Sequence, residues 1–238
     1  FRSLGGAGVV QGNIEFSSSD NLHFWGYNGS AMVFELTTTQ VFRDPAAWYH
    51  IVAVWDSANA TSSSRARLYV NGVQVTSFST STYPSQNASN STIAWNTAVA
   101  HYISRALYYP MDCYLAEVNF IDGQALTPSS FGKTNAATGQ WIPKKYGGTY
   151  GTNGFYLRFA DASAATAAAI GKDSSGNGNN WTPNNISVTS GATYDSMTDV
   201  PTLTSPTAAN YCVWNPLARF TGGNTATITN GNLLTTGA

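Results

Sequence analysis

Charged side chains are scarce in this sequence. Of its 238 residues 10% are Asp, Glu, Lys or Arg, and 11 basic residues against 12 acidic ones give a net charge of −1. A protein that binds the phosphate backbone of a nucleic acid, or an anionic membrane surface, needs a concentrated basic patch. The sequence contains no cluster of that kind, so neither nucleic acid nor a membrane is expected as a partner.

Long apolar runs are missing as well. No window approaches the roughly 18 consecutive apolar residues that span a bilayer. The chain starts at Phe1 without a Met and without a charged-then-apolar leader, so we expect a processed chain or a piece of a longer one. Cysteine is limited to Cys113 and Cys212, which form at most one bridge and are otherwise two partly buried thiols.

The patterns that carry most enzyme and zinc chemistry are also absent. His23, His50 and His101 stand apart from one another, and no His-x-x-x-His or Cys-x-x-Cys spacing suits zinc. No Gly-x-Ser-x-Gly nucleophile elbow and no Gly-rich phosphate loop occurs. We therefore expect each histidine to have an ordinary role in a strand or loop.

What the sequence has in quantity is β-branched and aromatic residues between short polar turns. Two such runs lie at 47–55 and 67–78, and Asn71-Gly72 divides the second. This dipeptide readily supplies the two consecutive positive φ angles of a type I′ turn, so a hairpin is predicted there. Residues 47–55 are apolar on both faces, which predicts a central strand.

Other strands are predicted by the same pattern of short apolar runs and polar turns, which indicates antiparallel sheets. They lie at 9–16, 22–27, 32–36, 100–104, 113–121 and 154–159. Helix is expected only in short turns, such as one at 128–131. The Ser-, Thr- and Asn-rich stretch 79–97 is predicted to be an exposed rim loop that contains at most short strands.

Two segments resemble a known superfamily. W-Y-H-I-V-A-V-W-D at 48–56 and R-L-Y-V-N-G-V-Q-V at 67–75 are similar to the centre of a laminin-G-like, or pentraxin-like, domain of the concanavalin A-like lectin/glucanase superfamily. The resemblance implies an all-β fold, a two-sheet antiparallel jelly-roll sandwich that usually binds glycans or proteins and only sometimes hydrolyses them. We expect this sandwich at residues 1–190, followed by an extended C-terminal connector at 191–238.

Three further segments resemble one particular group within this superfamily. They read Y-L-A-E-V-N-F-I-D-G-Q-A-L-T-P-S-S-F-G at 114–132, G-Q-W-I-P-K-K-Y-G-G-T-Y-G-T-N-G-F-Y-L-R-F at 139–159 and G-K-D-S-S-G-N-G-N-N-W-T-P-N-N-I at 171–186. They are similar to laminin-G-like proteins of tailed bacteriophages, in which such domains belong to tail fibres or head appendages. This resemblance implies an extracellular place in a virion, with other virion proteins as partners.

The C-terminal segment bears on assembly. From Tyr194 onward Pro, Thr and Asn are scattered with little periodicity, so this segment buries too little apolar surface to hold one shape alone. If ordered, it is expected to lie against another subunit or domain. Symmetric trimers are common among the phage appendages that the chain resembles, so a homo-oligomer, with a trimer favoured, is expected.

The superfamily includes β-glucanases, whose paired carboxylates stand about 5 to 5.5 Å apart on one face of a strand. The nearest candidate here is the run from Glu117 to Asp122. With a period of two, Glu117 and Asn119 share a face whereas Asp122 points to the other. We find no same-face pair, assign no catalytic residue, and expect the protein not to be an enzyme.

Aromatic residues are plentiful, with 13 Tyr and seven Trp. Sugar rings stack on aromatic faces, and neutral glycans are held by Asn, Ser and backbone hydrogen bonds, so this composition suits a glycan-binding protein. Aromatic residues near strand ends or loops are the candidate contacts: Trp25, Tyr27, Trp95, Tyr108 and Tyr109. The alternative for each is packing or a subunit interface.

One loop is a candidate cation site. In D-S-S-G-N-G-N-N at 173–180, Asp173 and Asn177 offer the oxygen ligands that calcium prefers, although the loop lacks the terminal Glu of an EF-hand. The alternative is a Gly- and Asn-rich turn in which Asp173 caps local backbone N–H groups. No other cofactor is expected.

These observations favour a non-catalytic structural and adhesive module of a bacteriophage virion appendage or decoration protein, with host-surface glycan as the candidate ligand. Two alternatives stay open. One is a purely architectural virion connector or decoration domain without a ligand. The other is a secreted protein that binds or degrades glycan.

Overall fold

The computed structural model describes residues 1–5, 10–104, 113–190, 194–197, 200–201, 227–229 and 233–236. Its contacts divide the chain into two units. The first contains Phe1–Asp44, Tyr49–Asp112 and Ala125–Tyr146, and the second contains Pro45–Trp48, Cys113–Gln124 and Gly147–Ala238. The boundaries of these units differ from the expected domain boundary between residues 190 and 191, which stays a prediction.

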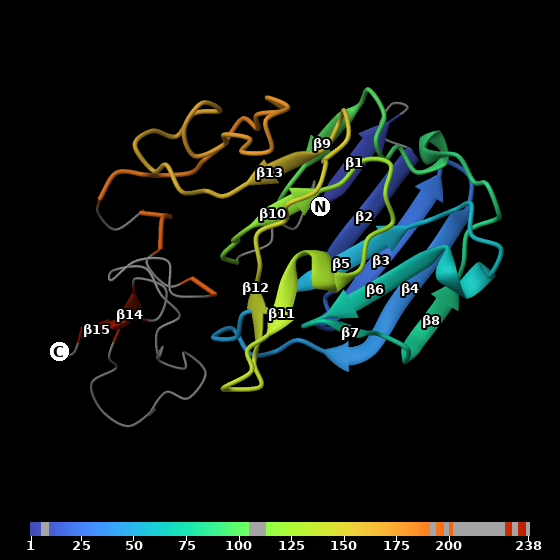
Figure 1. The fold of residues 1–238 in the computed structure, drawn as a ribbon, viewed down its shortest axis with the longest axis horizontal. Coiled ribbons are helices and arrows are strands. Elements are labelled where there is room, and N and C mark those ends of the chain that lie inside the picture. Colours follow the sequence, from blue (N-terminus) through green and yellow to red (C-terminus); the bar gives the residue numbers. More distant parts are fainter. Residues whose placement is uncertain are drawn as a thin grey trace. The chain divides into compact units, whose positions relative to one another are not determined.

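The first unit contains a six-stranded antiparallel sheet with the order β8-β4-β3-β2-β1-β9 (Figure 1). The central strands β1 to β4 form a meander, in which each strand pairs with the next along the chain. The strands are β1 (Arg2–Gly5), β2 (Val10–Phe16), β3 (Asn21–Asn28), β4 (Met32–Val41), β8 (Phe78–Thr82) and β9 (Ala100–Tyr102).

A three-stranded antiparallel sheet, β5-β6-β7, is the second layer of this unit. Its strands are β5 (Ile51–Trp55), β6 (Ala66–Val70) and β7 (Val73–Gln74). Asn71 and Gly72 join β6 to β7 with φ angles of 48° and 83°, which confirms the predicted hairpin with two positive-φ residues.

The position of β5 corrects one prediction. Its apolar residues on both faces indicated a central strand, but β5 is an edge of the three-stranded sheet. Apolar residues on both faces indicate that other parts of the protein pack above and below the sheet. They carry no information on whether a hydrogen-bonded neighbour lies on each side, which is what distinguishes an edge from a centre.

The core lies between the two sheets. Leu22, Phe24, Phe34 and Leu36 of β3 and β4 are at most 1% exposed, and they form one cluster with β6 residues including Leu68. The rings of Phe24 and Phe34 meet edge to face, with centroids 4.7 Å apart. The predicted all-β sandwich with two packed antiparallel sheets is confirmed in this unit.

The stretch 79–97 differs from the predicted exposed rim loop in the burial of its end, not in its short strand. It contains β8 and the 3-10 turn η2 (Asn90–Thr92), after which Ile93, Ala94 and Trp95 are 0%, 3% and 7% exposed. The indole of Trp95 stacks on Phe24 with centroids 5.2 Å apart. These three apolar residues anchor an otherwise polar segment because their burial removes apolar surface from water.

A second hairpin packs against the β6–β7 turn. It consists of β11 (Gly132–Thr134) and β12 (Trp141–Pro143), and it follows the 3-10 turn η3 (Pro128–Ser130), which confirms the short turn predicted at 128–131. The Trp141 ring covers Gly72, where an added Cβ would lie 2.5 Å from the ring. Trp141 Nε1 donates to Nδ1 of His50 at 3.0 Å.

The second unit contains the antiparallel pair β10 (Val118–Phe120) and β13 (Phe155–Leu157) and the hairpin β14 (Thr227–Thr229) with β15 (Leu234–Thr236). The hairpin falls within the segment predicted to be an extended connector. Across the described ranges, helix is limited to 3-10 turns of three residues, including η1 (Ser62–Ser64). Accordingly, none of these helices could span a membrane.

Replacing Gly12 of β2 by Ala should destabilise the sandwich. The new Cβ would lie 2.2 Å from Nε1 of buried Trp95 and 2.7 Å from the backbone oxygen of Ile93, so the core must shift. Overpacking of this kind typically costs roughly 1–3 kcal/mol. Urea unfolding would measure the loss, with Gly147→Ala, which meets open space, as the matched control. Equal stability of the two variants would contradict the packing described here.

Candidate functional site

The alternation of β2, β3 and β4 gives the six-stranded sheet two different faces. Leu22, Phe24 and Gly26 point to the core, so His23, Trp25 and Tyr27 point to the opposite side. We call that side the outer face. The register adds residues of neighbouring strands to it, because Glu15 pairs with His23 and Glu35 pairs with Trp25.

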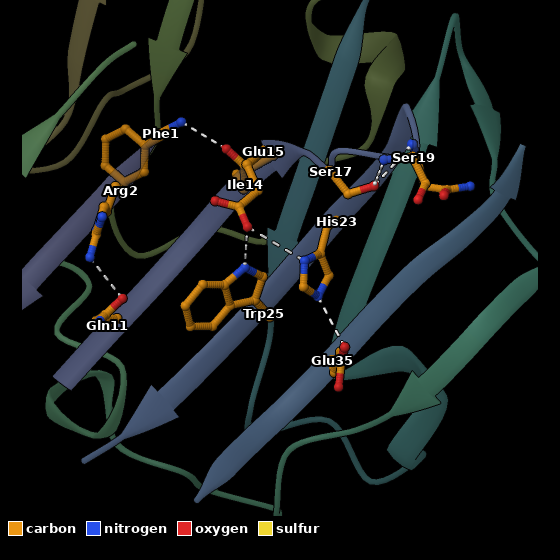
Figure 2. A network of polar contacts seen from close by, with 11 residues as sticks. Phe1, Arg2, Gln11, Ile14, Glu15, Ser17, Ser19, His23, Trp25 and Glu35 are labelled. Atoms are coloured by element: carbon orange, nitrogen blue, oxygen red, sulfur yellow. Dashed lines mark hydrogen bonds and ion pairs between the residues drawn. The ribbon is translucent and has the colours of Figure 1, made fainter. Parts of the chain in front are cut away.

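Three side chains on the outer face form a connected polar cluster (Figure 2). His23 lies between two carboxylates: its Nε2 is 3.1 Å from Oε1 of Glu35, and its Nδ1 is 3.5 Å from Oε1 of Glu15. Trp25 Nε1 donates to the same Glu15 oxygen at 2.8 Å. The cluster therefore fixes the edge of the indole against β2.

The environment of Glu15 favours its ionised form. Burial opposes ionisation, but the hydrogen bonds from His23 and Trp25 and the charges of His23 and Arg2 outweigh it. Together they hold the pKa of Glu15 below its ordinary value of 4.5. A fixed carboxylate thus stands beside the indole ring of Trp25, where it can accept a hydrogen bond from a ligand as well.

A second polar group lies on the same face over β1 and β2. Arg2 Nη2 donates to Oε1 of Gln11 at 2.9 Å, and Figure 2 shows this pair beside Trp25. In the register Arg2 stands opposite Asn13, and Asn13 stands opposite Trp25. One row across three strands thus places a guanidinium, an amide and an indole side by side.

Of the five predicted glycan contacts, three lie within the described residues, and the structure brings two of these together. Trp25 and Tyr27 are half-buried and share the outer face two residues apart on β3. Trp95 is a correction: it is 7% exposed in the core, so its ring cannot stack on a sugar. Tyr108 and Tyr109 lie outside the described residues.

Glu15, His23 and Glu35 are the site residues that the sequence analysis missed. A signal for them existed, since three predicted strands joined by tight turns imply a meander. Its pairing places Glu15 opposite His23 and Glu35 opposite Trp25 on one face. Each residue alone looked ordinary because only the pairing of strands brings them together.

Comparison with known families agrees with this geometry. A family model described as the concanavalin A-like lectin/glucanases superfamily matches residues 3–130, more than half of the chain. The chain belongs to this superfamily. No curated protein and no solved structure matches it. The matched range includes the six-stranded sheet from the second residue of β1 onward and the whole three-stranded sheet, so the superfamily sandwich carries the outer face.

Because the superfamily name includes glucanases, the carboxylates of the chain bear on catalysis. Glu15 and Glu35 share the outer face, which the sequence analysis did not foresee. The imidazole of His23 fills the space between them. A glycosidase pair needs that space for the sugar and, in inverting enzymes, for a water.

The predicted strand 113–121 is wrong in its extent, because only β10 (Val118–Phe120) forms there and Glu117 precedes it with a φ of 56°. The carboxylate of Glu117 has a different environment from the carboxylates of the outer face. Glu117 accepts a hydrogen bond from the hydroxyl of Tyr156, while Tyr150 donates to Oδ1 of Asn119 at 3.0 Å. The two tyrosine rings stack with centroids 6.2 Å apart. Burial, with the hydrogen bond and charge of Glu117, raises the pKa of Tyr156. Glu117 therefore belongs to a packed tyrosine cluster of the second unit.

The loop at 173–180 is organised by the carboxylate of Asp173, which is 5% exposed. Its Oδ1 accepts from the backbone N–H groups of Tyr156 and Ser175, and its Oδ2 accepts from the Ser175 hydroxyl and the Asn179 N–H. Burial raises the pKa of Asp173, but these hydrogen bonds outweigh it and lower the pKa.

Asn177 also serves the loop itself, because its Nδ2 donates to the backbone oxygens of Gly151 and Gly154 at 2.6 and 2.8 Å. Donors surrounding a carboxylate favour the capping alternative of the sequence analysis. In the described parts of the chain, no group of three or more His, Cys, Asp or Glu side chains is placed to hold a metal ion. Calcium at Asp173 and Asn177 stays a prediction.

Glu15→Gln should reduce the acid sensitivity of the fold. Because the pKa of Glu15 is lower in the folded chain than its ordinary 4.5, its ionised form contributes stability at neutral pH. That contribution is lost as the pH falls below 4.5 and through the folded pKa. Urea midpoints from pH 7 to 3 should therefore fall less in the variant than in the parent. Thr37→Ala, on the same face, is the nontitrating control, and identical pH profiles would contradict the prediction.

Asp173→Asn should loosen the 173–180 loop, since an amide replaces one acceptor oxygen facing N–H donors. Hydrogen bonds to a buried charged group are each worth about 1.5–3 kcal/mol, so a loss of about 2 kcal/mol is expected. Thermal unfolding measures it, with and without calcium or a chelator. A calcium-dependent rise in the parent that the variant lacks would instead establish the calcium site.

Proposed function

We propose that this chain is a non-catalytic adhesive module that binds glycan on the outer face of its six-stranded sheet. The observation that carries the proposal is the pair Trp25 and Tyr27, which share that face. Aromatic rings supply the stacking surface that sugars need, and the polar cluster of Glu15, His23 and Glu35 supplies hydrogen bonds beside it. Membership of a lectin-containing superfamily supports the same function.

The absence of catalysis is part of the proposal. It is supported by the position of His23, which contacts both carboxylates of the outer face and occupies the gap between them. A retaining or inverting glycosidase needs an open approach from both carboxylates to the scissile bond. It is also supported by Glu117, whose carboxylate is engaged by Tyr156.

We further propose that the module belongs to a virion appendage or decoration protein of a bacteriophage, where it contacts other virion proteins and recognises host-surface glycan. The support is the resemblance of 114–132, 139–159 and 171–186 to phage laminin-G-like proteins. The low charge and the Ser-, Thr- and Asn-rich sequence suit such an extracellular setting. Assembly as a homo-oligomer, with a trimer favoured, is proposed for the same setting.

A glycan array probed with the purified chain tests the binding function. We expect binding to at least one glycan class, with affinity lowered about tenfold or more by Tyr27→Ala, since removal of a stacked ring costs on the order of 1–2 kcal/mol. Trp25→Phe keeps an aromatic face but loses the bond to Glu15, so a smaller loss is expected.

Tyr114→Ala, which removes an aromatic residue 49% exposed in the second unit, is the matched control and should bind like the parent. Loss of affinity in this control, or full affinity in Tyr27→Ala, would place binding away from the outer face. Release of reducing sugar from a bound glycan would instead support the glycan-degrading alternative. Immunolocalisation in intact phage particles tests the virion setting.

A further inference from the structure

The outer face contains two buried donors that no hydrogen bond among the described residues uses. Asn13 is 1% exposed, and within the described residues its Nδ2 has no hydrogen-bond partner. The same holds for Nε of Arg2, the residue opposite Asn13 in the register. Leaving a buried donor unpaired costs about 1–3 kcal/mol, and more for a charged group, so such atoms need an explanation.

Both donors belong to the outer face. Gly12 points to the core, because a Cβ added there would meet Trp95, so Asn13 points to the opposite side. Trp25 is the cross-strand partner of Asn13. The row Arg2, Asn13, Trp25 therefore presents two unused donors next to an aromatic ring, and Figure 2 shows Arg2 and Trp25 on this side of β2.

Two unused donors call for an acceptor group on the ligand, and the charges nearby restrict which one. The carboxylates of Glu15 and Glu35 lie on the same face, against the one guanidinium of Arg2 among the named residues of the face. An anionic group, such as a uronate carboxylate or a sulfate, would accept from the donors but would be repelled by the two carboxylates. A neutral acceptor avoids this repulsion.

We infer that this row binds the acetamido group of an N-acetylated amino sugar, an inference that rests on the proposed glycan-binding function. The acetamido carbonyl accepts from Nδ2 of Asn13 and Nε of Arg2. Its methyl group packs on the indole of Trp25, and its N–H donates to a carboxylate. The contacts of Glu15 and Glu35 described above all use Oε1, and each carboxylate has a second oxygen that can accept.

Binding requires a modest rearrangement, because both donors are covered in the free chain. Arg2 and Gln11 have long side chains, and rotamer changes of such residues are common when a ligand binds a preformed face. The Glu15, His23 and Trp25 contacts hold the indole in place meanwhile. Trp25 on β3 is thus held in place, whereas Arg2 on β1 can change its rotamer to meet the ligand.

Calorimetric titration of the full chain with three trisaccharides tests the inference. They are N,N′,N″-triacetylchitotriose (called chitotriose below) and cellotriose, which are both β-linked, and the α-linked trigalacturonate. We expect chitotriose to bind about tenfold or more tightly than cellotriose, since one or two hydrogen bonds distinguish them. Asn13→Ala should reduce that ratio to about one while cellotriose affinity is kept. Thr80→Ala, an exposed residue on the edge strand β8 of the same sheet, should leave the ratio unchanged.

Arg2→Met, which keeps the aliphatic stem and removes the Nε donor, should also lower the ratio and decides the matter if Asn13→Ala fails to fold. Preference for cellotriose or trigalacturonate would overturn the acetamido inference and leave glycan binding intact. An unchanged preference in both variants would overturn it too, because neither donor would then contact the acetamido group. Binding to no sugar on any array would overturn the inference and the proposed function together.

Discussion

The structure of the first unit depends on the packing of aromatic side chains between its two sheets. Trp95 stacks on Phe24, and Phe24 meets Phe34 edge to face, so one contact chain joins a segment outside the meander to its central strands. The packing is close enough to demand glycine at Gly12 and Gly26, where an added Cβ would lie 2.2 Å from Trp95 and 2.3 Å from Ile93. Protein interiors are packed as densely as organic crystals, so these contacts leave no room for a larger side chain at either position.

This core also determines what the other side of the sheet presents. With Leu22 and Phe24 held inside, strand geometry forces His23 and Trp25 outward, and a slip of one residue would exchange the two sets. Burial of the apolar set therefore stabilises the register that aligns Glu15, His23 and Glu35. The polar cluster needs no stability of its own to be placed accurately, since the hydrophobic face places it.

The 173–180 loop and the outer face, two polar sites among the described residues, use their hydrogen bonds differently. Both oxygens of the Asp173 carboxylate accept hydrogen bonds from donors of the same unit, so this side chain organises its loop. On the outer face, acceptors and donors are distributed over several strands beside an aromatic ring, and Nδ2 of Asn13 has no partner among the described residues. The first arrangement stabilises the fold, whereas the second offers contacts to a ligand.

The sequence by itself determined the local features. The positions of most strands followed from alternation, and the β6–β7 hairpin followed from Asn71 and Gly72, because periodicity and turn chemistry depend on neighbouring residues only. Only the tertiary structure decided that Trp95 is buried, that β5 is an edge and that Glu15 and Glu35 flank His23. The burial of Trp95 and the edge position of β5 depend on which distant segments pair and what covers them, which no local pattern of residues encodes. The position of His23 between the two carboxylates depends on the register of consecutive strands, which the meander pattern suggests and burial of the core face fixes.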